Sequence, residues 1–148
     1  MVNFDKYAQE GNLYLKELAE KLGHPDEKGR VSIIMRAVLH TLRERLTISE
    51  SFNLMSQLPM FLKAIYVDNW KYREKPAKIK DINDFTAEVE KYQSQYGEQE
   101  FDWKKPTDEI VKIVFNSLYS YISKGEAEDV LAQFPEELEP LIKESMAM

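Results

Sequence analysis

Two stretches of this 148-residue chain decide its fold, because they align with each other without gaps. Residues 32–66 read SIIMRAVLHTLRERLTISESFNLMSQLPMFLKAIY, and residues 108–142 read DEIVKIVFNSLYSYISKGEAEDVLAQFPEELEPLI. The offset of 76 residues pairs identical side chains at seven positions, whose first members are Ile34, Val38, Leu42, Glu50, Gln57, Pro59 and Leu62. Self-similarity of this kind indicates an internal repeat.

Each stretch begins with the pattern of an amphipathic helix. Apolar residues recur every fourth position from residue 34 to residue 46, and the second copy repeats them from residue 110 to residue 122. At 100° per residue these side chains share one face of a helix, which is typical of a helix packed on a core. The copies therefore predict two equivalent helices, each with one buried face.

A second, shorter helix is predicted after each of these. Thr47 with Glu50, and Ser123 with Glu126, have the S/T-x-x-E spacing of a capping box. In this motif the hydroxyl accepts from an early backbone amide, and the glutamate reaches back to the N–H of the cap residue. We expect both halves of the motif in both copies.

A Gln-apolar-Pro joint follows at residues 57–59 and 133–135. Proline is tolerated in the first turn of a helix and disfavours helix in the residue before it, so each joint predicts a sharp bend between two short helices. We expect the amides of Gln57 and Gln133 to bond backbone groups that the joint leaves unpaired.

The predicted architecture is an all-α bundle of about eight helices, built from two tandem repeats of about four helices each. The first repeat takes residues 1–70, a basic linker takes residues 71–81, and the second repeat takes residues 82–148. We expect the two repeats to pack as one globule.

Charge disfavours some partners. The net charge is −6, and it is uneven: residues 1–74 carry 11 Lys/Arg and 10 Asp/Glu, whereas residues 75–148 carry 9 and 16. An acidic surface repels phosphate backbones, and a basic stretch such as the linker is more often a solvated face. No apolar run is long enough to span a bilayer. From the charge and this absence we expect neither nucleic acid nor a membrane as partner. Binding of the basic linker to an anionic membrane or to nucleic acid is kept as a third alternative.

Composition also argues against most catalytic chemistry. The chain has no cysteine and two histidines, so we expect no metal, no cofactor and no enzymatic activity. The helical wheel turns His40 away from the apolar arc and toward solvent, although Glu44 lies four residues later. His24 follows a helix, where its imidazole is expected to meet the last carbonyls. No secretory signal is visible, and we expect a cytoplasmic protein.

Four stretches carry a family resemblance: residues 14–23 (YLKELAEKLG), 36–46 (RAVLHTLRERL), 57–59 (QLP) and 123–138 (SKGEAEDVLAQFPEEL). Together they resemble the bacterial domain of unknown function 2267 family over nearly the whole chain, including the duplication. The resemblance implies an all-helical bacterial protein. It implies no catalytic or binding residue.

The differences between the copies point to a contact surface. Three positions are apolar in the first copy and acidic in the second. In the alignment, Phe52, Met60 and Phe61 are paired with Glu128, Glu136 and Glu137. Either the N-terminal helix or the linker with Trp70 buries the apolar residues, or they form an exposed patch that binds a protein partner or a second copy.

We favour a non-enzymatic protein-interaction or self-association module. The alternative is a small-molecule site between the two repeats, because crevices between helical units can hold ligands. Its candidate lining is aromatic: Tyr92, Tyr96, Trp103, Tyr119 and Tyr121.

Overall fold

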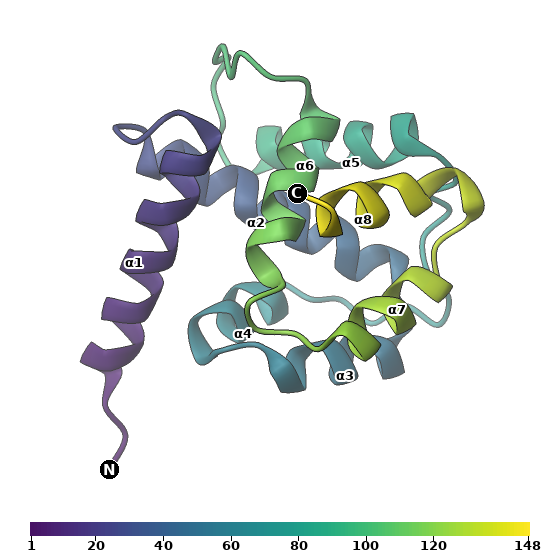
Figure 1. Cartoon of the computed structure of the whole chain (residues 1–148), viewed down its shortest axis with the longest axis horizontal. Coiled ribbons are helices and arrows are strands. Elements are labelled where there is room, and N and C mark those ends of the chain that lie inside the picture. Colours follow the sequence, from purple (N-terminus) through teal and green to yellow (C-terminus); the bar gives the residue numbers. More distant parts are fainter.

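A computed structural model describes residues 1–148 and contains eight α-helices, one short 3-10 helix and no strand (Figure 1). In chain order these are α1 (Phe4–Leu22), α2 (Lys28–Arg45), α3 (Ile48–Gln57), α4 (Met60–Val67), α5 (Ile82–Gln95), α6 (Thr107–Leu118), α7 (Lys124–Ala132), η1 (Glu136–Leu138) and α8 (Glu139–Met146). The predicted all-α class is confirmed. The division into two repeats of four helices stays a prediction.

α2 is the central element, and it packs against α1, α4, α5 and α6. A cluster of 32 buried hydrophobic residues runs through the molecule and includes Val38 of α2 and Val114 of α6. The segment 71–81 is attached to this body, because Ile79 is buried and the Ala77 N–H donates to the Glu44 carbonyl at 2.8 Å. The core therefore draws on residues from both predicted repeats.

The hydroxyl half of each predicted capping box is present. The Thr47 hydroxyl accepts from the Glu50 N–H at 3.2 Å, and the Ser123 hydroxyl accepts from the Glu126 N–H at 3.1 Å. These bonds satisfy amides that the first turns of α3 and α7 leave without a helical partner.

The glutamate half of the capping box prediction is wrong, and so is the expected role of the glutamines. The Thr47 N–H donates to Oε1 of Gln133 at 3.0 Å, and the Ser123 N–H donates to Oε1 of Gln57 at 2.6 Å. The reason is tertiary: α3 and α7 pack against each other, so each glutamine bonds the helix start in the other half of the chain.

Both histidine predictions are also wrong. His40 is 0% exposed, because α4 and α5 pack against α2 and cover the side that the helical wheel assigned to solvent. The His24 Nε2 donates to the Trp103 carbonyl at 2.8 Å instead of the end of α1. Gly23 caps the end of α1 instead: its backbone N–H donates to the carbonyls of Ala19 and Glu20. Gly23 has a left-handed conformation (φ +81°), which favours glycine.

The first turns of α1 extend away from the body, with the N-terminus at the outer end of the helix (Figure 1). Farther along, Gly11 lets α4 approach closely, since a Cβ atom there would lie 3.3 Å from Cβ of Phe61. None of the helices combines the length and apolar character that a membrane crossing requires.

Candidate functional site

A hollow of about 560 Å³ lies between the end of α2, the end of α5 and the segment that follows α4. Tyr92 and Gln95 of α5 and the C-cap residue Tyr96 have i, i+3, i+4 spacing, which puts them on one side of the end of this helix. The complete lining consists of Arg43, Glu44, Asn69, Trp70, Lys71, Arg73, Tyr92, Gln95 and Tyr96. Three of these side chains are cationic, one is acidic and three are aromatic.

His40 holds Tyr96 in position from beneath the hollow. Its Nε2–H donates to the Ile65 carbonyl at 2.7 Å, so its Nδ1 is left to accept from the Tyr96 hydroxyl. Burial lowers the pKa of His40 to about 4, which keeps the imidazole neutral at physiological pH. Arg36 lies 3.9 Å above the Tyr96 ring, in cation–π contact.

Arg43 is the fixed cation of the hollow. It is 3% exposed, and its Nη1 donates to the Tyr66 carbonyl at 2.6 Å and the Asp68 carbonyl at 2.8 Å. These carbonyls close the C-terminal end of α4, where a cation is also favoured by the helix dipole. The Nε of Arg43 is buried without a hydrogen-bond partner. The Trp70 ring lies 5.9 Å from the guanidinium.

Glu44 balances part of this charge. One carboxylate oxygen accepts from the Tyr92 hydroxyl at 2.9 Å, and the other pairs with Nε of Arg73. Burial and the bond to Glu44 raise the pKa of Tyr92 above its usual range, so this phenol stays protonated. Tyr92 and Tyr96 stack, with ring centroids 5.5 Å apart.

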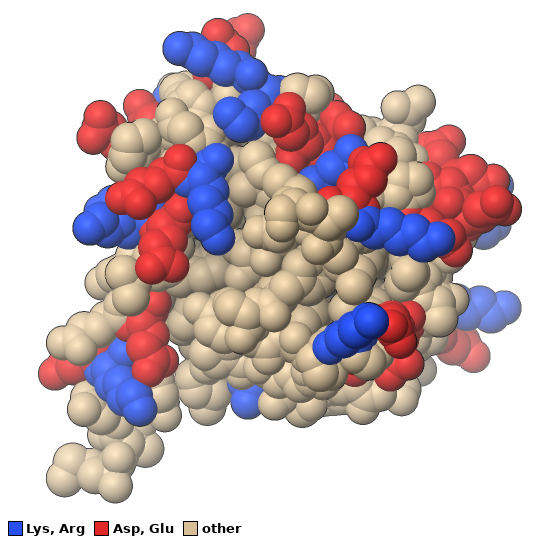
Figure 2. Space-filling view, in the orientation of Figure 1, with Lys and Arg blue, Asp and Glu red and all other residues tan.

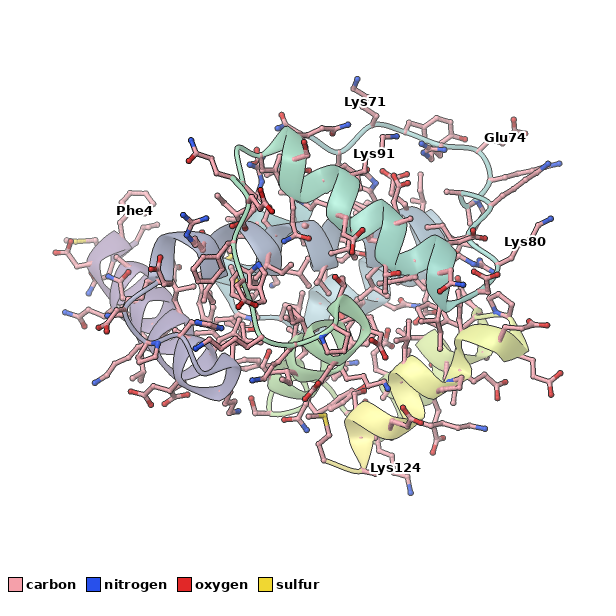
Figure 3. All side chains as sticks on the ribbon, turned by 90° about the horizontal axis from the view of Figure 1, so that it is seen from above. Phe4, Lys71, Glu74, Lys80, Lys91 and Lys124 are labelled. Atoms are coloured by element: carbon pink, nitrogen blue, oxygen red, sulfur yellow. The ribbon has the colours of Figure 1, made fainter.

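Lys71 stands at the rim of the hollow. Its labelled side chain extends into solvent beside α5 (Figure 3). The hollow thus contains three cationic side chains, those of Arg43, Lys71 and Arg73, and one acidic side chain, that of Glu44. Glu44 already forms an ion pair with Arg73. The hollow has a positive balance although the whole chain is acidic.

Of the five aromatic residues expected to line a ligand site, Tyr92 and Tyr96 meet in this hollow. The other three lie elsewhere. Trp103 packs on His24, the Tyr119 hydroxyl bonds that of Ser145 at 2.7 Å, and Tyr121 packs against α1 and α4.

Sequence reasoning missed Arg43, Glu44, Trp70 and Arg73 as members of the site. One signal for Arg43 was present: it occupies the position that Tyr119 holds in the second aligned stretch. Arg43 also lies three residues after His40, on the same helix face. The helical wheel turns His40 away from the apolar arc, yet both His40 and Arg43 are buried.

The residues expected to form a partner surface lie in two places. Phe52 is 60% exposed and its ring meets that of Trp70, with centroids 6.0 Å apart. Met60 is 50% exposed. Phe61 is half-buried and packs on Tyr14 of α1 with centroids 5.4 Å apart.

The sequence model of one protein family, described as Uncharacterized conserved protein (DUF2267), matches residues 11–141. The chain belongs to the DUF2267 family. The match spans every helix from the middle of α1 to the start of α8 and includes every residue of the hollow. No curated protein matches the chain.

Proposed function

We propose that this DUF2267 protein binds a small anionic ligand that carries an aromatic ring, in the hollow between α2, α5 and residues 69–73. The observation that carries the proposal is the lining itself: three cationic and three aromatic side chains around about 560 Å³. Ligand sites of small molecules fall in this range of volume and combine apolar walls with a few placed polar groups.

The two kinds of side chain divide the recognition. Trp70, Tyr92 and Tyr96 offer ring faces to a flat group, with Tyr92 and Tyr96 already stacked. Arg43 offers a buried guanidinium whose Nε lacks a partner, and a carboxylate or phosphate oxygen is the acceptor that a guanidinium binds best. Arg73 adds a second cation at the more open side.

Binding without catalysis fits this chemistry. Both ring nitrogens of His40 are engaged and burial holds its pKa near 4, so it is a poor acid or base at neutral pH. Glu44 is tied to Tyr92 and Arg73. A bacterial, cytoplasmic location remains the expectation from the sequence.

Calorimetric titration with an aromatic phosphate and two aromatic carboxylates tests the proposal: adenosine monophosphate, indole-carboxylate and hydroxybenzoate. Adenosine and inorganic phosphate are the matched half probes: adenosine has the aromatic ring without the anionic group, and phosphate has the anionic group without the ring. We expect a member of the panel to bind more tightly than either half probe.

Arg73→Gln is the diagnostic variant, because it removes a half-exposed cation from the hollow with little effect on the core. We expect about tenfold weaker binding, the equivalent of about 1.4 kcal/mol. Lys78→Gln is the matched control, since Lys78 is exposed on the same segment and does not line the hollow. Absence of binding by the whole panel at about millimolar concentration, or equal losses in both variants, would contradict the proposal.

Self-association is the second candidate function, and a surface on α1 and α4 favours it. Met60 is exposed at the start of α4, and Phe4 points outward at the free end of α1 (Figure 3). Figure 2 shows a broad area almost free of charged side chains over α4 and the end of α6, with Lys, Arg, Asp and Glu gathered around it. Exposed apolar side chains, such as Met60 and Phe4, on a surface with few charged groups are typical of a protein contact.

Light scattering over a range of concentrations tests this second candidate. We expect mass to rise with concentration, and Met60→Glu to abolish the rise, because a charge buried in an apolar contact is costly. Phe52→Glu is the control, since Phe52 is as exposed but lies against Trp70 instead of α1. A monomer at all concentrations would exclude the candidate.

A further inference from the structure

α3 and α7 pack against each other through a reciprocal set of hydrogen bonds. The side-chain oxygen of Gln133, at the end of α7, accepts a hydrogen bond from the N–H of Thr47. The side-chain oxygen of Gln57, at the end of α3, accepts one from the N–H of Ser123. In an ordinary capping box, the carboxylate of the glutamate accepts the hydrogen bond from this backbone N–H. Here the two glutamates of the motif are left free to point elsewhere.

The freed glutamates, Glu50 and Glu126, lie close to each other and to Asp129. One carboxylate oxygen from each of the three lies within 4.8 Å of those of the other two. Glu50 is 8% exposed and Glu126 is 6% exposed, and Oε1 of each is buried without a hydrogen-bond partner. Asp129 is exposed, so the cluster opens to solvent on one side.

The cluster has no balancing positive charge within the protein. No Lys, Arg or His forms an ion pair with any of the three carboxylates. Lys124, at the start of α7, points away from the molecule into solvent (Figure 3). Buried carboxylates in contact are unstable when all are ionised, so they require either a shared proton or a cation.

We propose that Glu50, Glu126 and Asp129 form a site for one divalent cation of the Mg²⁺, Mn²⁺ and Ca²⁺ class. The donors are all carboxylate oxygens, which hard cations prefer, and no imidazole or thiolate is present to select zinc or copper. The exposed side of Asp129 leaves room for the water ligands that these ions retain. The unpartnered Oε1 atoms of Glu50 and Glu126 gain a partner on binding.

A proton competes with the cation for the same oxygens. Burial and the nearby charge of Glu50 raise the pKa of Glu126 above its usual range. Since α3 and α7 belong to opposite halves of the chain, a bound cation would tie these halves together.

The first test measures Mn²⁺ binding to the full chain by electron paramagnetic resonance. The second measures thermal unfolding of the same chain in Mn²⁺, Mg²⁺, Ca²⁺ or EDTA. We expect one Mn²⁺ per chain and a Tm about 5 °C higher in saturating cation than in EDTA. Asp129→Asn should weaken binding at least about tenfold and remove most of the Tm difference. Glu128→Gln is the matched control, exposed on the same helix but outside the cluster, and should bind as the native chain does.

Glu126→Gln separates the cation from a shared proton. With a cation site, this variant loses Mn²⁺ binding and its Tm no longer responds to EDTA. With a proton alone, the native chain binds no Mn²⁺ at about millimolar concentration, and its Tm is the same in Mn²⁺ as in EDTA. That second result would overturn the proposal, as would equal Mn²⁺ binding by Asp129→Asn and the native chain. Ligand binding in the hollow is independent of either result, since none of the three carboxylates lines it.

Discussion

His40 makes the middle of the molecule sensitive to acid. Its imidazole is buried in the neutral form between the Ile65 carbonyl and the Tyr96 hydroxyl. Burial lowers its pKa from 6.5 in an unfolded chain to about 4 in the folded one. Between these values the unfolded chain binds a proton that the folded chain does not, so the free energy of unfolding falls as pH falls.

We therefore expect His40 to contribute to loss of stability between pH 6.5 and pH 4. His40→Gln keeps a polar group at the site but has no proton to gain, so its stability should fall less steeply over this window. Urea unfolding of both proteins across the window measures the difference. Parallel pH profiles would show that His40 does not titrate in this way.

Gln57 and Gln133 offer a second residue-scale test. The side-chain amide oxygen of each accepts a hydrogen bond from one backbone N–H at the start of a helix in the other half of the chain. Removing either side chain should lower the free energy of unfolding by about 1 kcal/mol, the net value of one hydrogen bond. Gln57→Ala and Gln133→Ala, compared by urea unfolding with Gln99→Ala on an exposed loop, check this. No difference from the loop variant would refute it.

At the scale of elements, α1 is a helix of two parts. Its buried side chains, Tyr14, Leu18, Ala19 and Leu22, all lie in the second part, and the first turns extend beyond the body (Figure 1). A helix segment without tertiary contacts opens easily, because most helix stability in proteins comes from packing.

Amide hydrogen exchange should therefore divide α1. We expect fast exchange from residues 4 to 10, with opening free energies close to those of a fraying end, and slow exchange around Leu18 and Ala19. Uniform protection along α1 in a monomer would contradict this. Protection that appears only at high concentration would instead support self-association through this helix.

α2 shows what helical periodicity leaves open. Its apolar face was predicted correctly, with Ile34, Val38 and Leu42 all buried. The helical wheel turns His40 toward solvent, yet His40 is buried, and so is Arg43 three residues later. Periodicity identifies a face that must be covered, but it does not exclude that hydrogen-bonded polar groups on the other face are covered as well.

At the scale of the whole molecule, one core should give one unfolding transition. The hydrophobic cluster includes Leu39 of α2 and Leu141 of α8, from opposite halves of the chain. Leu39→Ala and Leu141→Ala should each cost about 2–5 kcal/mol, the range for buried leucine truncation. Calorimetry should show each variant lowering the Tm of the same single transition. Two separable transitions would indicate that the halves fold independently.

The sequence by itself determined the all-α class, the apolar faces of α2 and α6, and the hydroxyl caps at Thr47 and Ser123. These features depend on residues within one or two helical turns, so local spacing is sufficient to predict them. It also singled out Tyr92 and Tyr96, although without their cationic neighbours.

Only the tertiary structure decided which distant segments meet. It joined Gln57 to Ser123 and freed Glu50 to face Glu126. It also closed the hollow by laying residues 69–73 beside α5. The physical reason is that a buried polar group must find a partner wherever the packed backbone provides one, and that partner can lie anywhere along the chain.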